Sequence, residues 1–361
     1  MVAYAEGTQG SKRRLKGLLT PSADLSGIFL LTNYEGSEMP AAKKWFLAIA
    51  GVIALTFGLA ACGGGDEGES GDGTGNAEVI QSNDANADVK LTIGSKNFTE
   101  QIVLGEIYAQ ALEAAGYDVK TDLNLGSETV ALQALEADEV SGYPEYISTA
   151  LTSFYGKDPE AVPADPEEGA AQVNKEASKD GLVALAPTPF SSANAVGLLT
   201  ERANELGVEK ISDLEGISDQ LALYGSPECR QRIDCLLGLQ ENYGLDFKSF
   251  TPVDIGLRYE VLDKGQADVS ILFTTDANLG ASDKYTTLED DLGVLPSGNV
   301  IFMTKQTTID EAGPDYPATI ELVQGGLTEE VMQELSARVD LDKEKPADVA
   351  AAYLEEAGYI E

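Results

Sequence analysis

The sequence predicts an α/β protein with two lobes, and three observations support this prediction. From residue 89 onward, short apolar runs typical of strands alternate with longer segments that have one apolar face and are typical of helices. This alternation favours parallel sheets covered by helices. The length of 361 residues is sufficient for about two domains. An apolar fraction of 43% with 24% charged residues is ordinary for a globular chain, so acidity alone does not indicate disorder.

The first predicted elements are a strand at 89–94 and a helix that follows it. Asn97 is expected to be the N-cap of this helix, with Glu100 at the capping-box position, and Gly116 is expected to end it. A second strand is expected near 117–123 and a second helix from Ser127 to about Ala137. Residues 184–186 and 195–199 have strand character on either side of a polar, proline-containing segment.

A second α/β unit is expected from residues 211–214 and 221–224 onward, continuing through 268–273. A strand at 299–303 and helices at 317–322, 328–339 and 347–357 complete the chain. We therefore expect lobe 1 to comprise 89–195 plus 299–361, and lobe 2 to comprise 196–298, with hinges around 186–198 and 296–304. A small ligand is expected to bind in the crevice between the lobes.

The N-terminal part predicts export and anchoring. Residues 39–61 have the two lysines, apolar stretch and small-residue end of a signal peptide, and Leu59–Cys62 resembles the bacterial lipobox, which predicts lipidation of Cys62. The alternative is a single membrane-spanning helix. Residues 1–38 are expected to precede the true start at Met39, unless they form a long n-region. Residues 62–88 are rich in glycine and acidic residues and predict a flexible tether.

The anchored chain is therefore expected outside the cytoplasm, held at the outer face of the cell membrane by its lipid. In that compartment Cys229 and Cys235, six positions apart, are expected to form a disulfide, and the alternative is two free thiols.

Charge and composition exclude several functions. The sequence has 61 Asp and Glu against 24 Lys and Arg, a net charge of −37, and no histidine. This charge disfavours binding to nucleic acid, and the absence of histidine excludes His-dependent catalysis and His-ligated metal sites. No GxxxxGK[ST] phosphate-binding loop is present. We expect no cofactor and no metal site.

Six ordered motifs carry a family resemblance across residues 89–361. They are GSKNFTEQIVLGEIYAQAL (94–112), YPEY (143–146), IGLRYEVLDKGQADV (255–269), FTTDA (273–277), LEDD (288–291) and LTEEVMQELSARVD (327–340). The chain resembles the substrate-binding proteins of osmoprotectant ABC importers, the glycine betaine/choline/carnitine family. The resemblance implies a type II periplasmic-binding-protein fold whose lobes close on a quaternary ammonium solute. It also implies delivery to a membrane permease driven by a separate ATPase, by a protein that is a monomer and not an enzyme.

The resemblance also implies the site, since aromatic faces attract a cation that cannot donate hydrogen bonds. Three positions match the family pattern directly: Gln101, Tyr146 and Thr149. At three further aromatic positions of the family the aligned residues are Asn194, Phe273 and Ser297, so two of about four cage aromatics are replaced by polar residues. Additional candidates are Ser192, which could bind a polar group, and Tyr143, for which packing inside the lobe is an equal alternative.

The sequence leaves other interpretations open. The polar replacements suit another polar zwitterion or an amino acid in the same fold. Glu100 and Glu145 could be mistaken for the carboxylate pair of a surface-anchored hydrolase, and a structural lipoprotein without a ligand is a third possibility. Lys96 is expected to be solvated rather than to contact a ligand carboxylate, and Asp276 is expected to cap a turn.

Overall fold

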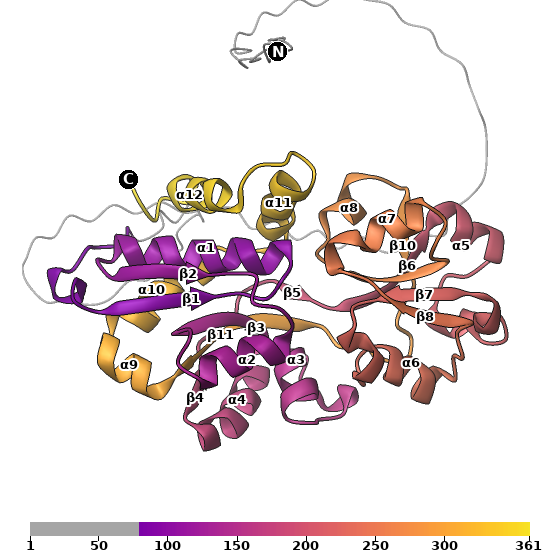
Figure 1. The fold of residues 1–361 in the computed structure, drawn as a ribbon, viewed down its shortest axis with the longest axis horizontal. Coiled ribbons are helices and arrows are strands. Elements are labelled where there is room, and N and C mark those ends of the chain that lie inside the picture. The colour runs from indigo at the N-terminus through magenta and orange to yellow at the C-terminus, as the bar shows by residue number, and fades with distance from the viewer. Residues whose placement is uncertain (1–78) are drawn as a thin grey trace, which may run out of the picture. The chain divides into compact units, whose positions relative to one another are not determined.

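The computed structural model describes residues 79–361, so the predicted extension, signal peptide and Cys62 lie outside the described residues. The described part folds into two α/β lobes, each built around its own sheet (Figure 1). The prediction of a two-lobed α/β protein is therefore confirmed. Within residues 79–361, none of the helices has the length and apolarity needed to cross a bilayer.

The sheet of lobe 1 has the strand order β2-β1-β3-β11-β4, with β5 paired to β11. Its strands are β1 (Lys90–Gly94), β2 (Asp118–Asp122), β3 (Gly142–Tyr146), β4 (Leu182–Ala184), β5 (Ser191–Ser192) and β11 (Gly298–Lys305). β1 runs parallel to β2 and β3, but β11 runs antiparallel to β3, β4 and β5. The expectation of parallel sheets is therefore correct only for β1, β2 and β3, because β11 returns from lobe 2 in the opposite direction.

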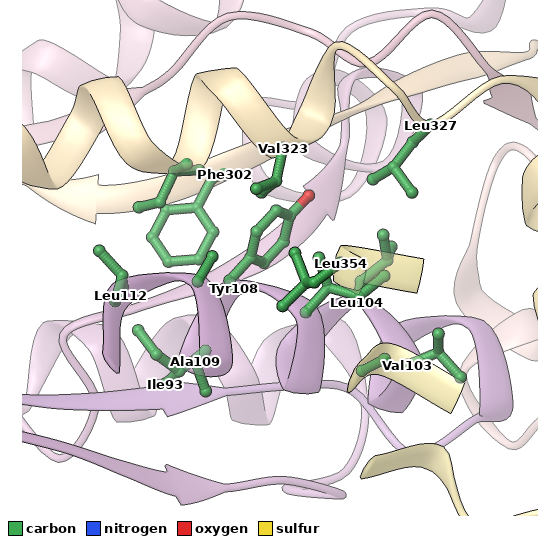
Figure 2. Packing of buried hydrophobic residues seen from close by; sticks show 14 of the residues in the cluster. Ile93, Val103, Leu104, Tyr108, Ala109, Leu112, Phe302, Val323, Leu327 and Leu354 are labelled. Carbon is green, nitrogen blue, oxygen red and sulfur yellow. The ribbon is translucent and has the colours of Figure 1, made fainter. Parts of the chain in front are cut away.

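Eight of the described α-helices belong to this lobe. They are α1 (Thr99–Ala114), α2 (Glu128–Glu136), α3 (Ile147–Thr149), α4 (Pro166–Ala177), α9 (Gln306–Ala312), α10 (Asp315–Gln324), α11 (Glu329–Asp340) and α12 (Pro346–Glu356). α1 is the central helix of the lobe, and its apolar side chains pack with Phe302 of β11, Val323 of α10 and Leu354 of α12 (Figure 2). Burial of these side chains is the main contribution to the stability of lobe 1.

The start of α1 differs from the expectation. Its N-cap is Phe98, which has an extended backbone (φ −144°, ψ 161°) and makes no side-chain capping bond. Asn97 is exposed, and its backbone N–H donates to Gly126 O at 3.1 Å. The expected Asn97 cap is therefore wrong, because the loop before α1 is held by backbone pairing to the loop before α2 instead of by a capping side chain.

Lobe 2 has a second mixed sheet with the order β10-β6-β9-β7-β8. Its strands are β6 (Asn194–Leu199), β7 (Ala222–Gly225), β8 (Ser249–Pro252), β9 (Val269–Phe273) and β10 (Tyr285–Thr287), and its α-helices are α5 (Thr200–Leu206), α6 (Leu236–Tyr243), α7 (Arg258–Asp263) and α8 (Ala277–Ala281). β7 is parallel to β8 and β9, whereas β6 is antiparallel to β9 and β10. A separate apolar core that includes Leu198, Leu223 and Leu239 holds this lobe together.

The chain passes between the lobes twice, and the two passages are paired. Ser191 and Ser192 of β5 pair antiparallel with Asn299 and Gly298 at the start of β11. A Cβ atom at Gly298 would lie 2.4 Å from Ser148 Oγ and 2.6 Å from the Ser148 backbone nitrogen, so only glycine fits at this crossing. Both passages lie within the segments expected to be hinges.

The described part of the expected tether, residues 79–88, packs on lobe 1. The backbone N–H of Ile80 donates to Tyr359 O at 2.8 Å, and Asn86 is buried with its side-chain amide donating to Ala115 O at 2.9 Å. Residues 81–88 are mostly polar, as expected of a tether, but the segment makes specific backbone contacts that composition does not reveal.

Candidate functional site

A cleft lies between the two lobes and takes side chains from both. The lining includes Lys96, Phe98, Glu128, Tyr146, Ser148, Thr149 and Ser192 from lobe 1 and Asn194, Glu228, Cys229, Arg232, Asp234, Cys235, Arg258 and Phe273 from lobe 2. Tyr146 ends β3, Asn194 begins β6 and Phe273 ends β9. The lining residues therefore sit where strands begin or end against the facing lobe, as expected for a ligand crevice in an open α/β sheet.

Three aromatic rings meet in this cleft. Phe98 stacks on Tyr146 with ring centroids 6.4 Å apart and an interplanar angle of 12°. The ring centroid of Phe98 also lies 5.0 Å from that of Phe273 across the cleft. Phe98 and Phe273 are half-buried, and Tyr146 is buried. Clustered aromatic faces of this kind attract a cation, including one that has no hydrogen-bond donor.

Lys96 is a buried member of this wall, contrary to the expectation of a solvated side chain. Its ammonium forms an ion pair with Glu145, which is fully buried, and Lys96 Nζ lies 4.4 Å from the Tyr146 ring centroid. Burial raises the pKa of Glu145, and the neighbouring Lys96 acts in the opposite direction. The expectation is wrong because Glu145, on the adjacent strand β3, supplies a counter-ion that sequence spacing does not indicate.

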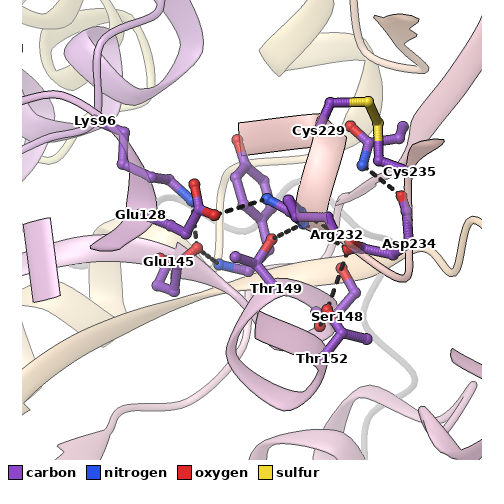
Figure 3. Close-up of polar contacts among 12 residues, drawn as sticks. Lys96, Glu128, Glu145, Ser148, Thr149, Thr152, Cys229, Arg232, Asp234 and Cys235 are labelled. Carbon is purple, nitrogen blue, oxygen red and sulfur yellow. Dashed lines mark hydrogen bonds and ion pairs between the residues drawn. A yellow bond between two sulfur atoms is a disulfide. The ribbon is translucent and has the colours of Figure 1, made fainter. Parts of the chain in front are cut away.

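A disulfide-closed loop forms the opposite wall. Cys229 and Cys235 are joined, and between them Arg232 and Asp234 project toward lobe 1 (Figure 3). Arg232 Nε donates to Asp234 Oδ1 at 2.8 Å, and Arg232 Nη2 donates to both Asp234 Oδ2 and Thr149 Oγ1. Contacts from both lobes therefore fix the position of the Arg232 guanidinium.

Lobe 1 contacts the same loop through two further groups. Glu128 Oε1 lies 3.5 Å from Arg232 Nη1, and Thr152 Oγ1 donates to Asp234 Oδ2 at 3.1 Å. Burial alone would raise the pKa of Asp234, but the Arg232 guanidinium lowers it below its usual value. Arg232 and Asp234 thus form a charged pair that also bridges the two lobes.

A third cation, Arg258, lies behind Phe273. It forms an ion pair with Asp276, and its Cζ atom is 4.4 Å from the Phe273 ring centroid. Asp276 also accepts hydrogen bonds from the Phe273 backbone N–H at 2.9 Å and from the Tyr259 hydroxyl at 2.8 Å. Asp276 therefore has the structural role expected of it, since it fixes the turn that carries Phe273.

Five of the eight residues predicted to bind ligand line the cleft: Tyr146, Thr149, Ser192, Asn194 and Phe273. The other three do not. Gln101 is fully buried in α1, and among the described residues its amide has no hydrogen-bond partner. Tyr143 is fully buried and its hydroxyl lies 3.4 Å from Glu145 Oε2. Ser297 is exposed, with its Oγ atom 2.9 Å from Ser191 Oγ at the lobe crossing.

Asn194 has a structural contact that accounts for its polarity. Its side-chain amide donates to the backbone carbonyl of Asp234 at 2.9 Å. The position at which the family pattern has an aromatic residue therefore supports the disulfide-closed loop in this chain. A hydrophobic ring at residue 194 would leave that carbonyl without this donor.

Several cleft residues are not among the predicted candidates. Phe98 supplies an aromatic ring at a position where the family pattern indicates no tyrosine, although it lies two residues after Lys96 in the first family motif. Glu128, Arg232 and Asp234 come from segments outside the six motifs, and the only signal near Arg232 and Asp234 in the sequence is the pair of flanking cysteines.

Glu100 and Glu145 do not form the carboxylate pair of a hydrolase in this cleft. Neither lines it: Glu100 accepts a hydrogen bond from the Tyr146 hydroxyl, and Glu145 is paired with Lys96. Both carboxylates support the side chains that do line the cleft.

Comparison with known families agrees with the architecture. Residues 89–356 match the family described as the substrate-binding domain of ABC-type glycine betaine transport systems.

Two named proteins are similar to this chain in sequence. A glycine-betaine-binding protein of Pseudomonas aeruginosa is 32% identical over 277 residues, covering 74% of this chain and 87% of the relative. The carnitine transport binding protein OpuCC of Listeria monocytogenes is 26% identical over 279 residues, covering 75% and 88%.

Among solved structures, one described as a glycine betaine/carnitine/choline ABC transporter aligns with a TM-score of 0.59 and 25% identity. The alignment covers 76% of this chain and all of that chain. A lactococcal protein in a closed conformation with glycine betaine aligns with a TM-score of 0.56 at 15% identity, covering 74% and 96%, which shows a shared fold.

Proposed function

Because the chain belongs to the family of substrate-binding domains of ABC-type glycine betaine transport systems, we propose that its cleft captures a quaternary ammonium solute outside the cytoplasm. The fold and transporter class implied by the sequence motifs are confirmed by this membership.

The observation that carries this proposal is the group of three aromatic rings shared by the two lobes. Phe98 and Tyr146 come from lobe 1 and Phe273 comes from lobe 2. A trimethylammonium group placed among them would contact aromatic faces from both lobes, each worth about 0.5–2 kcal/mol. Binding would therefore favour the arrangement in which the lobes are together, as in hinge closure around a ligand.

Hydroxyl groups nearby suit the polar end of such a solute. Ser148, Thr149 and Ser192 are buried and line the cleft within the lobe that also carries Tyr146. A hydroxyl or carboxylate on the solute would find hydrogen-bond donors there.

A second candidate is an amino acid or another polar zwitterion. It is favoured by the acidic side chains in the lining, Glu128, Glu228 and Asp234, because a primary ammonium can donate hydrogen bonds to carboxylates. A quaternary ammonium cannot do so. The two candidates are therefore distinguished by whether affinity rises or falls when the amine of the solute is fully methylated.

The experiment is a calorimetric titration of the protein with glycine betaine, choline, carnitine, glycine and proline. We expect binding of at least one quaternary ammonium compound and a weakening of roughly 2- to 30-fold in Tyr146→Ala. Tyr155→Ala, which removes a half-buried tyrosine outside the cleft lining, is the matched control and should bind normally. Binding of glycine or proline alone would support the second candidate, and unchanged affinity in Tyr146→Ala would exclude the proposed site.

The chain is further proposed to act as a lipid-anchored monomer that delivers its solute to a permease served by a separate ATPase. The support is the lipobox-like segment ending at Cys62 and the transporter family itself. A single thioether-linked diacylglycerol would hold the protein at the outer face of the membrane without a spanning helix.

Replacement of the lipidated cysteine tests the anchor. We expect Cys62→Ala to be released from the membrane fraction into the extracytoplasmic soluble fraction, whereas Cys229→Ala, which also removes one cysteine, stays with the membrane. Tight membrane retention of Cys62→Ala would instead favour a spanning segment.

A further inference from the structure

The cleft holds a guanidinium that is already engaged by protein carboxylates. Of the five N–H donors of Arg232, three point to Asp234 and Thr149, while Nη1 lies 3.5 Å from Glu128 Oε1. Asp234 reaches Arg232 from the same loop, whereas Glu128 reaches it from the first residue of α2 in lobe 1 (Figure 3). Arg232 therefore has a carboxylate partner on each side of the cleft.

Glu128 is a protein carboxylate that already pairs with Arg232. It lines the cleft, its side chain is only 9% exposed, and among the described residues Arg232 is the only cation within ion-pair distance of it. A buried carboxylate with a single counter-ion is strongly affected by any further negative charge brought close to it.

The other two cations of the lining are no more available to an anion. Lys96 is paired with Glu145, and Arg258 is paired with Asp276. The three cations thus face five carboxylates: Glu128, Glu228 and Asp234 in the lining, and the two partners just named. The local charge balance favours a cation over an anion.

From this arrangement we infer that Glu128 is a specificity-determining residue that disfavours solutes carrying a carboxylate. A ligand carboxylate directed at Arg232 would be the third carboxylate around one guanidinium and would have to displace Glu128. A quaternary ammonium alcohol meets no such repulsion, and its hydroxyl can donate to Glu128. A protein charge that repels the wrong ligand is one way in which a binding site gains specificity. The inference rests on the proposed function, since it concerns the polar end of the same solute.

The test compares choline, which has a hydroxyl and no carboxylate, with glycine betaine, which has a carboxylate. Both are titrated calorimetrically into the full chain and into Glu128→Gln, an isosteric change that removes the charge. We expect Glu128→Gln to shift the ratio of the two dissociation constants toward glycine betaine by about tenfold or more. Glu128→Ser, which suits the start of a helix, serves as a second variant if Glu128→Gln fails to melt cooperatively.

Glu136→Gln is the matched control, because it removes the same charge from the same helix, α2, at an exposed residue outside the cleft lining. We expect this variant to change the ratio far less. An unchanged ratio in both Glu128 variants, or the same shift in Glu136→Gln, would overturn the inference while leaving the proposed function intact. Failure of the unaltered protein to bind any quaternary ammonium compound would instead overturn the proposed function, and the inference with it.

Discussion

Glu100 connects the first turn of α1 to the aromatic wall of the cleft. It is buried, and its carboxylate accepts a hydrogen bond from the Tyr146 hydroxyl. Burial raises the pKa of Glu100 above the usual value of a glutamate, although hydrogen bonds from Thr275 and Tyr146 act in the opposite direction. The residue that positions the tyrosine is therefore itself sensitive to pH.

This raised pKa predicts a specific dependence of stability on pH. The folded protein holds the Glu100 proton more tightly than the unfolded chain, so the contribution is fully present below the unfolded pKa near 4.5. It is lost as pH rises through the higher folded value. We expect Glu100→Gln to remove this loss, so that the difference in unfolding free energy between variant and parent grows with pH above about 4.5. Urea unfolding at a series of pH values measures it, and a difference independent of pH would contradict the prediction.

The loop closed by Cys229 and Cys235 is the element that most directly shapes the cleft. It carries Arg232 and Asp234, and Asn194 holds its backbone from β6. The loop therefore fixes a charged pair on the lobe 2 wall, although it contains no long regular helix or strand.

Removal of the disulfide should affect both stability and binding. For a closed loop of this size the chain-entropy model gives roughly 2 kcal/mol of stabilisation, and we expect the Cys229→Ser, Cys235→Ser double variant to lose about that much. Its solute affinity should fall as well, because Arg232 and Asp234 are less restrained. Urea unfolding and calorimetry measure the two effects, with Cys62→Ser as the control. A variant that loses stability but binds normally would show that the loop is not needed for the site.

Elements with local signals could be predicted from the sequence. The last two helices, α11 and α12, begin and end within two residues of the expected 328–339 and 347–357. Their apolar spacing and turn residues lie within one short segment, so the prediction needs no contact with distant residues. Tyr146 and Phe273 are indicated by the family motifs YPEY and FTTDA, which lie in single short segments. Asn97 as a cap was wrong, since the competing backbone bond comes from Gly126.

Contacts between distant segments could not be predicted in this way. The antiparallel direction of β11 depends on the return of the chain from lobe 2, and the pairing of Lys96 with Glu145 depends on the neighbouring strand. Arg232 reaches Glu128 and Thr149 from a different lobe. No periodicity within a single segment reports such contacts, which is why the lining was only partly predicted.

At the scale of the whole molecule, the dominant property is net charge. The sequence carries −37 at neutral pH, and like charges on a compact surface repel one another more than in an expanded chain. This repulsion opposes the folded state and is screened by salt.

We therefore expect added salt to stabilise the protein. Raising NaCl from about 0.02 to 0.5 M shortens the screening length from roughly 20 to 4 Å, and the melting temperature should rise by a few degrees. Differential scanning calorimetry measures the change, and KCl at the same ionic strength should give the same rise. A melting temperature that falls or stays constant would mean that surface repulsion is not a significant term.

The paired crossing between the lobes also sets the order in which the chain can fold during synthesis. Lobe 2 begins and ends beside the contact of Ser192 with Gly298, so its whole length is made before β11 appears. β11 then takes a central place between β3 and β4. The sheet of lobe 1 therefore cannot be completed until lobe 2 has been synthesised, because the strand between β3 and β4 is missing before then. A nascent chain that stops short of Gly298 can complete the inserted lobe but not the lobe in which the chain begins.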